Sequence, residues 1–507
     1  MTGASSEPAG GSDARSATET EDIAALAKGG RANVFGFLLR LAARLPFLFI
    51  AGRMYGAETL GRFAYAILVV EFAAQLATLG LKRGLAGGLT HTERPHEHVV
   101  ADAMLVTLIA ALIAAGILIA FPQAMFPNSG INGLDRLLPL IAIAVATSDV
   151  ALAACAYRFD IGATVRARSI VEPWTISIAA LAFYYYSARD GLILAYVLSM
   201  IAAMIASLIP LVRHYGVPRD WRPHPPQLWV LVRRNLPLAA ADAVEWGSRR
   251  IDLAILGLFA APYVVGIYYV AQQVASLPQK LKTSFDPILG PVITRNVADG
   301  NYANIARQVS QVGFWIIAAQ TGIALALGIP GEAVMGLVGA HFVGGTSALA
   351  FLLAAEVVAA TAVVSESALV YLARHRNLVI SLGMIGLQAL LSFALMLTAR
   401  RLELNPLVLA AAPALALCVA LAAGSLVKAK LLARLLQAPV NAWRWALLWA
   451  AAAGGLAGAA FVALPHRLEW VELVVGVPTI LGVYCFVIWR RGFGPDDRAL
   501  FRRQKPG

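Results

Sequence analysis

Long apolar runs alternate with short polar connections along the whole chain. Each run has about 18 to 25 residues, the length that an α-helix needs to cross the hydrocarbon of a bilayer. The pattern therefore predicts an all-α polytopic membrane protein with about 14 transmembrane helices. The predicted helices are centred near Pro46, Val70, Ala110, Val145, Ile178, Ile201, Val244, Gln273, Ala319, Val358, Leu387, Leu415, Gly455 and Val477.

The composition excludes a soluble protein. Hydrophobic residues make up 59% of the chain and charged residues only 14%, whereas about a quarter of the residues of a soluble domain are charged. No segment is long enough to form a separate soluble domain, and no G-x-x-x-x-G-K-S/T motif indicates an ATPase module. The three cysteines lie within predicted helices, and the histidines of "HTERPHEH" lack a ligand spacing. Neither a disulfide framework, a metal site nor a cofactor is expected.

The distribution of basic residues predicts the orientation in the membrane. Most of the 41 Lys and Arg residues lie in the even-numbered connections and the two tails, and by the positive-inside rule this side faces the cytoplasm. We therefore expect a multi-pass protein of the bacterial cytoplasmic (inner) membrane with both termini in the cytoplasm. The net charge of +12 needs no nucleic-acid partner. The basic residues of the opposite side are Arg53, Arg62, Arg136, Arg189, Arg400, Arg401 and Arg467.

An internal repeat predicts two lobes. "GRMYGAETLGRFAY" from Gly52 aligns with "GLFAAPYVVGIYYV" from Gly257, and Gly61 then matches Gly266. Each copy lies between the first and second helix of a six-helix block, so the repeat is parallel, with a pseudo-two-fold axis along the membrane normal. We expect the two lobes to face a central cavity.

The predicted organisation has six parts. They are a disordered cytoplasmic tail at 1–30, an N-lobe of six helices at 31–213, a cytoplasmic linker at 214–234, a C-lobe of six helices at 235–436, two C-terminal helices at 437–490 and a cytoplasmic tail at 491–507.

Three segments carry a resemblance to a known family. They are "MYGAETLGRFAYAILVVEFAAQLATLGL", "SRRIDLAILGLFAAPYVVGIYYVAQQVASLPQ" and "ILGPVITR". The chain resembles the polysaccharide transporter and O-antigen flippase family of the multidrug/oligosaccharidyl-lipid/polysaccharide (MOP) exporter superfamily. "GAETLGRFA" is similar to the signature G-P-E-x-F-G-x-(Y/F), with Ala57 where proline is common, and Asp252 falls where the family places an acidic residue. The resemblance implies a polyprenyl-diphosphate-linked oligosaccharide as the cargo.

Two arginines in the first predicted helix fit a diphosphate head group. Arg40 and Arg44 lie four residues apart on one helix face, where an unpaired charge is costly. Arginine keeps its charge when buried and binds phosphate oxygens with its planar fork. The alternatives are ion pairs with carboxylates of other helices and, for Arg40, a side chain that extends to the interface. The predicted head-group site consists of Arg40, Arg44, Arg249, Arg250 and Lys280.

Embedded acids form the second set of candidates. Asp242, Glu245, Arg249 and Asp252 share one face of the seventh predicted helix, which predicts either a cavity lining or an ion-pair network between the lobes. Isolated acids in other helices would bind a coupling ion or neutralise an arginine. The candidates for ion coupling or interlobe pairing are Glu71, Asp149, Asp242, Glu245, Asp252 and Glu356.

The eighth predicted helix contains Pro278 and Pro287, which predict kinks and a hinge for alternating access. Lys280 and Lys282 lie near the cytoplasmic interface, where extension towards water is the alternative to contact with the cargo.

Together these features predict a transporter that is not an enzyme and that translocates a lipid-linked oligosaccharide by alternating access. Its product would supply lipopolysaccharide (O-antigen) or exopolysaccharide assembly. A multidrug-type cation antiporter and a membrane-embedded polymerase or ligase are the alternatives. The first requires an acidic or aromatic cavity, and the second a sizeable external segment. The expected state is a monomer, and polysaccharide-assembly proteins such as a polymerase are further candidate partners.

Overall fold

The computed structural model describes residues 45–90, 92–282, 293, 296–297, 300–463, 469–494 and 497–498, without the side chains of 161, 277–282 and 469. These residues are 86% helical and contain no strand. In the part of the chain that the structure describes, ten helices are long and apolar enough to cross a membrane. All fourteen predicted centres lie in helical segments, of which α7 (Glu172–Tyr184) and α10 (Ile251–Phe259) are short. The prediction of an all-α polytopic fold is confirmed.

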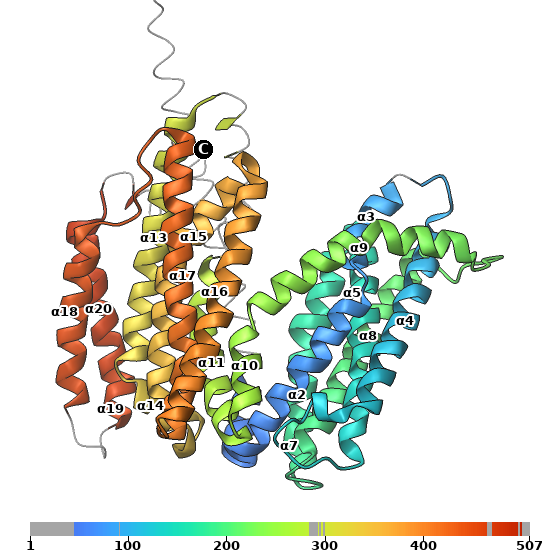
Figure 1. Cartoon of the computed structure of the whole chain (residues 1–507), viewed down its shortest axis with the longest axis horizontal. Coiled ribbons are helices and arrows are strands. Elements are labelled where there is room, and N and C mark those ends of the chain that lie inside the picture. Colours follow the sequence, from blue (N-terminus) through green and yellow to red (C-terminus); the bar gives the residue numbers. More distant parts are fainter. Residues whose placement is uncertain are drawn as a thin grey trace, which may run out of the picture.

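The first bundle, the N-lobe, contains the helices up to α8 (Figure 1). Its principal elements are η1 (Ala51–Tyr55), α2 (Gly56–Ala77), α3 (Leu81–Thr90), α4 (His96–Ala120), η3 (Leu134–Leu140), α5 (Ile141–Tyr157), η4 (Val165–Val171), α7 and α8 (Gly191–Tyr215). The next helix, α9 (Pro225–Ser248), packs against α2, α3 and α4 of the N-lobe.

The second bundle, the C-lobe, begins with α10. Its elements are α10, α11 (Pro262–Lys282), α13 (Tyr302–Gly328), α14 (Gly331–Val338), η5 (Ala340–Gly345), α15 (Thr346–Leu372), α16 (Arg374–Arg401) and α17 (Pro406–Leu436). A final hairpin of α18 (Trp445–Val462), α19 (Glu469–Val471), η7 (Glu472–Gly476), α20 (Val477–Val487) and η8 (Ile488–Gly492) packs on α13.

The two bundles meet at one end and diverge towards the other (Figure 1). We call these the joined end, which holds η1, α14 and the connection at 121–133, and the diverging end, which holds the connections at 92–95 and 216–224. At the joined end a single hydrophobic cluster contains residues of both lobes, such as Phe63 and Phe342. Towards the diverging end each lobe has its own cluster, with Val150 in one and Leu432 in the other.

Glycines allow the lobes to approach closely at the joined end. A Cβ atom on Gly61 would lie 1.8 Å from the carbonyl oxygen of Pro262, and one on Gly266 would lie 1.9 Å from that of Ala57. Helices α2 and α11 therefore cross with their backbones in contact. Gly61 and Gly266 are the pair that the repeat matched, and Ala57 and Pro262 occupy equivalent positions in the two copies. This reciprocal contact is consistent with the predicted parallel pseudo-two-fold relationship.

The prediction that the seventh helix presents one continuous polar face is wrong. Helix α9 ends at Ser248 and α10 begins at Ile251, so Arg249 and Arg250 lie at a break. Two residues of low helix propensity, Gly247 and Ser248, precede the break. Helix α9 packs on the N-lobe, whereas α10 packs on α11, α16 and α17 of the C-lobe. The break therefore separates Asp252 from the other polar residues of the stripe.

The predicted hinge lies only partly within the described residues. Pro278 is part of α11, which is helical from Pro262 to Lys282, and Pro287 lies outside the described residues. The hinge stays a prediction.

Candidate functional site

Arg250 at the helix break joins the seventh span to the N-lobe. Its guanidinium lies 2.9 Å from a carboxylate oxygen of Glu71 on α2 and 4.9 Å from the centre of the Trp246 ring. The hydroxyl of Tyr196 on α8 donates a hydrogen bond of 2.6 Å to Glu71. Glu71 thus connects α2 to α8 and to the α9–α10 break.

Arg83 on α3 connects two of the predicted acids. Its Nε atom lies 2.8 Å from Asp242, and its terminal nitrogen donates to Glu245. Glu245 also lies 3.1 Å from Arg249 one turn further along the chain. The side chains of Arg83 and Arg249 are 51% and 59% exposed, whereas that of Asp242 is 3% exposed. Arg83, Arg249 and Glu245, whose side chain is 46% exposed, therefore form the accessible side of this group of charges.

Asp149 on α5 is the centre of a third group. It lies 3.2 Å from Lys82 and also pairs with Arg168 on η4. Arg168 in turn lies 3.1 Å from Glu172 at the start of α7. Neither Lys82 nor Arg168 is among the candidates that the sequence indicates, because their neighbours in the chain do not reveal which acid each cation contacts.

These side chains form a charged cluster with as many cations as acids. We define it as Glu71, Lys82, Arg83, Asp149, Arg168, Glu172, Asp242, Glu245, Arg249 and Arg250. Five members are basic and five are acidic. Among the described residues the cluster is therefore neutral overall, with charged groups on α2, α3, α5, η4, α7, α9 and the α9–α10 break.

Asp252 occupies a different environment in the C-lobe. It is 1% exposed and accepts hydrogen bonds from the hydroxyl of Tyr268 at 2.5 Å and from the side-chain amide of Gln272 at 3.1 Å. Its Oδ1 atom has no hydrogen-bond partner among the described residues. No described cation pairs with Asp252, which distinguishes it from the acids of the charged cluster.

The remaining candidates are not brought to this cluster. Glu356 lies in α15 and is half-buried. Lys280 belongs to α11, with its side chain outside the described part. Arg40 and Arg44 lie outside the described residues, so the predicted arginine pair stays a prediction.

The two helical bundles, joined at one end, define an all-α polytopic membrane fold with a charged cluster on its N-lobe helices and the α9–α10 break. The fold is similar to that of an inward-facing multidrug resistance MATE family transporter of the MOP superfamily, with a TM-score of 0.61 and 15% identity over 79% of this chain and 99% of that chain. It is similar also to the lipid II flippase MurJ in an inward closed conformation, with a TM-score of 0.59 and 12% identity over 90% and 98% of the two chains.

An outward-facing MATE family transporter gives a lower TM-score of 0.50, at 14% identity over 83% of this chain and 96% of that chain. No curated protein matches the chain.

Residues 50–318, more than half of the chain, match the model of a family described as polysaccharide biosynthesis protein. The chain belongs to this family. The predicted membership of a polysaccharide biosynthesis family is confirmed, and the fold is similar to that of transporters of the MOP superfamily.

Proposed function

We propose that the protein turns a polyprenyl-diphosphate-linked oligosaccharide from the inner to the outer leaflet of the bacterial cytoplasmic membrane. The proposed mechanism is alternating access, and the product would supply O-antigen or exopolysaccharide assembly. Membership of a polysaccharide biosynthesis family supports the pathway. Similarity in fold to a lipid II flippase and to a MATE transporter supports transport rather than an enzymatic reaction.

The proposed orientation places the diverging end in the cytoplasm. Arg94, Arg219 and Arg222 lie in the connections at this end, and cytoplasmic connections are the ones enriched in Arg and Lys. With this orientation the structure is an inward-facing state, able to receive a head group from the inner leaflet. We further propose that both termini are cytoplasmic, because most Lys and Arg residues lie in the even-numbered connections and the two tails.

The proposed location of the head-group site rests on one observation. Arg83 and Arg249 share Glu245 as a partner, and all three expose about half of their side chains, whereas Asp242, the second partner of Arg83, is buried. A guanidinium that shares a carboxylate can exchange it for a phosphate oxygen, because both acceptors fit its planar fork. Diphosphate oxygens would thus replace Glu245 as a partner of Arg83 and Arg249.

Charge balance explains why the first span would also contribute. A diphosphate diester brings about two negative charges, whereas the charged cluster is neutral among the described residues. Arg40 and Arg44 would add two positive charges, which compensate those of the head group. We infer that the net charge is close to zero when the head group is bound and positive when the site is empty. A low-dielectric interior favours the neutral, bound complex.

Asp252, in the C-lobe, suits a role in coupling transport to an ion gradient. Asp252 has no described cationic partner, so its charge can be balanced by a bound proton or metal cation. Glu356 is the further candidate in this lobe. In the N-lobe, Glu71 and Asp149 already pair with Arg250, Lys82 and Arg168, and their proposed role is to hold these cations in place.

The test uses purified protein in liposomes that contain a fluorescent polyprenyl-diphosphate oligosaccharide. Transfer between leaflets is measured by the fraction of fluorescence that a membrane-impermeant reductant quenches. The wild type is compared with Arg44→Ala and Arg249→Ala. Arg234→Ala is the matched control, because Arg234 is exposed on α9 and belongs to no described ion pair of the cluster.

Transfer by the wild type and the control, with a loss of tenfold or more in the two other variants, supports the proposal. A wild type that moves no lipid but extrudes an organic cation against a proton gradient would replace it with the cation antiporter.

A further inference from the structure

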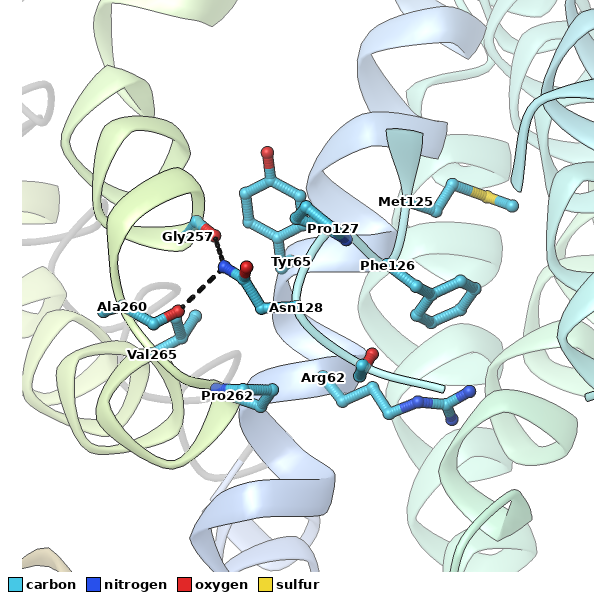
Figure 2. A pocket seen from close by; sticks show the side chains of 12 residues that line it. Arg62, Tyr65, Met125, Phe126, Pro127, Asn128, Gly257, Ala260, Pro262 and Val265 are labelled. Carbon is cyan, nitrogen blue, oxygen red and sulfur yellow. Dashed lines mark hydrogen bonds between the residues drawn. The ribbon is translucent and has the colours of Figure 1, made fainter. Parts of the chain in front are cut away.

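The connection between α4 and α5 reaches from the N-lobe to the C-lobe at the joined end. The side-chain amide of Asn128 donates hydrogen bonds of 2.8 Å to the carbonyl oxygen of Gly257 and 3.1 Å to that of Ala260 (Figure 2). Gly257 lies in the last turn of α10, and Ala260 is the residue that ends the helix. Carbonyls in the last turn of a helix have no partner within the helix, and an amide group has two hydrogens to donate. Asn128 thus caps α10 from the opposite lobe.

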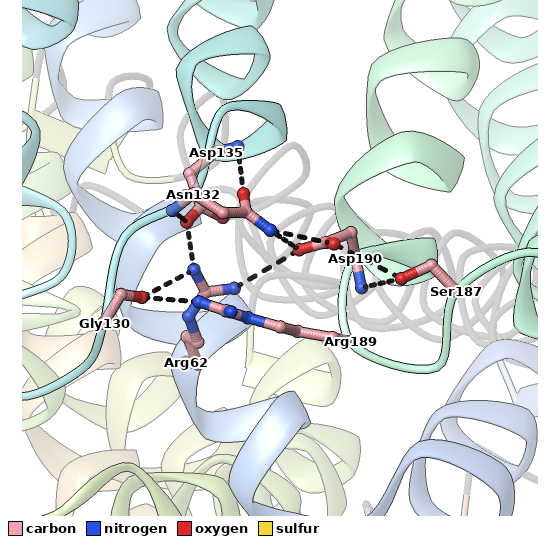
Figure 3. A network of polar contacts seen from close by, with 7 residues as sticks. All are labelled: Arg62, Gly130, Asn132, Asp135, Ser187, Arg189 and Asp190. Carbon is pink, nitrogen blue, oxygen red and sulfur yellow. Dashed lines mark hydrogen bonds and ion pairs between the residues drawn. The ribbon is translucent and has the colours of Figure 1, made fainter.

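The same connection is held to the N-lobe by a buried network (Figure 3). Arg62 on α2 is 8% exposed, pairs with Asp135 and donates a hydrogen bond of 3.1 Å to the carbonyl oxygen of Gly130. The Asn132 amide donates to both carboxylate oxygens of Asp190 at 2.9 Å. Asp135 and Asp190 are 0% and 5% exposed. We call residues 126–135 the 126–135 loop.

Further contacts make the loop a rigid part of the N-lobe. The backbone N–H of Asn132 donates to Asp135 at 2.7 Å, and the backbone N–H of Asp135 donates to Asn132 at 3.0 Å. The Arg62 guanidinium also lies 4.4 Å from the centre of the Phe126 ring. Removing one partner of a buried charge pair is strongly destabilising. The loop and the N-lobe therefore move together when the lobes separate.

The contact of the loop with the C-lobe is different in kind. Among the described residues its polar part consists of two neutral hydrogen bonds from Asn128, an exposed side chain. Neutral hydrogen bonds that water can replace are far weaker than a buried ion-pair network. When the joined end opens, the weaker contact separates first. The lobes thus separate between Asn128 and α10, and the Arg62 network stays intact.

We propose that Asn128 is a positioning residue of the transport cycle: it holds the joined end closed in the inward-facing state and releases α10 when the protein turns outward. This inference rests on the proposed alternating-access function. Arg53 on η1 donates a hydrogen bond of 3.0 Å to the carbonyl oxygen of Leu337 on α14 and acts beside Asn128 in the same state. The Arg62 network keeps Asn128 at the height of the α10 C-terminus.

The experiment measures the populations of the two states without any cargo. Spin labels are placed at the joined end on Tyr186→Cys and Leu402→Cys and, in a second sample, at the diverging end on Val217→Cys and Lys430→Cys; all four native residues are exposed. The three native cysteines are first replaced by alanine. Distances are recorded by double electron–electron resonance on the full-length protein in nanodiscs.

Asn128→Asp keeps the size of the side chain but removes both donors. We expect it to raise the ratio of molecules with a long joined-end distance to those with a short one roughly tenfold, as the loss of one to two neutral hydrogen bonds implies. The diverging-end distance shortens in the same molecules. Asn128→Ser, which retains one donor, gives an intermediate ratio. Ser129→Ala is the matched control in the same loop and leaves both distributions unchanged.

An Asn128→Asp protein that keeps the wild-type thermal stability and the wild-type distances would overturn the inference. If the distances shift but the wild type moves no lipid-linked oligosaccharide in liposomes, the role of Asn128 stands and the proposed cargo fails. If Asn128→Asp unfolds, the ratio is taken from Asn128→Ser, and no difference between this variant and Ser129→Ala contradicts the proposal.

Discussion

Gly61 on α2 and Gly266 on α11 lie in backbone contact across the two lobes. A Cβ atom on Gly266 would come within 3.0 Å of the Gly61 nitrogen, and one on Gly61 within 2.4 Å of the Gly266 nitrogen. The same two residues are equivalent in the internal repeat. The repeat thus brings a pair of equivalent positions face to face at the joined end, where small residues allow helices to approach.

Replacing either glycine should separate the lobes. In Gly61→Ala the new methyl group overlaps the carbonyl oxygen of Pro262, which is backbone and has no rotamer to change. We expect a destabilisation of about 1–3 kcal/mol, the usual cost of overpacking, and a slower transfer of lipid. Thermal unfolding in detergent measures the first effect. Gly116→Ala on α4 is the control, because no atom lies within 4 Å of a Cβ at that position; equal effects of the two substitutions would contradict this account.

Arg250 and Glu71 provide a test of whether the charged cluster binds cargo or only stabilises the fold. Arg250→Ala leaves Glu71 with one partner fewer, and Glu71→Gln removes the acid. We expect each to lower the free energy of unfolding by about 1–3 kcal/mol. The double exchange Glu71→Arg with Arg250→Glu should recover much of this stability, because the pair is reformed with the charges reversed.

Leaflet transfer separates the two roles of this pair. If Arg250 contacts the head group, the exchanged protein stays at least tenfold slower than the wild type although it is folded. If transfer recovers together with stability, the pair is structural.

Asp252 should affect ion dependence more than cargo binding. Asp252→Asn preserves the size of the side chain and an acceptor for Tyr268, but it cannot take up a charge-balancing ion. We expect transfer in the wild type to respond to a proton or sodium gradient and transfer in the variant to lose this response. The measurement varies the gradient at constant cargo. Tyr268→Phe, which removes one hydrogen bond and keeps the carboxylate, should retain the response; a variant Asp252→Asn with an unchanged response would exclude coupling at this residue.

The sequence predicts the helices and their order well, because long apolar runs have few alternatives in a bilayer. It also identifies Gly61 and Gly266 through the repeat. The break after Ser248 is not predicted, since the polar period of α9 continues through Arg249 to Asp252 as if the helix were continuous. The break depends on tertiary contacts, with α9 packed on one lobe and α10 on the other.

The partners of the charged side chains could not be predicted from the sequence either. Arg83 and Asp242 are far apart in the chain, and nothing in "LKRGL" indicates that its arginine contacts α9. Arg62 could be assigned to the outer side by its position between the first two predicted helices, but its burial against Asp135 follows from the fold of the 126–135 loop. Such long-range pairs can be identified only from the three-dimensional arrangement of the helices. The hydrophobic periodicity of the sequence does not specify this arrangement.

The C-terminal hairpin offers a prediction for pH. Asp497, beyond the last span, lies 2.5 Å from Arg444 and accepts hydrogen bonds from the indole N–H of Trp315 at 2.9 Å and the backbone N–H of Gly494 at 2.9 Å. Burial by itself raises the pKa of Asp497, but the hydrogen bonds from Arg444, Gly494 and Trp315 outweigh it and hold the pKa below the ordinary value of 3.8. The contact links the segment after α20 to α13 and to the start of α18.

A carboxyl group whose pKa is lower in the folded state stabilises that state above its unfolded pKa, and the contribution is lost as the pH falls through the folded value. We therefore expect Asp497→Asn to lower the thermal midpoint at pH 7, and the difference from the wild type to shrink as the pH falls below 3.8. Thermal unfolding in detergent across this range measures it, with Asp220→Asn as the control, an exposed acid in the connection between α8 and α9. A difference that stays constant down to the lowest pH would show that the charge of Asp497 does not fasten the hairpin, and that packing of α18 and α20 on α13 holds it without help from this ion pair.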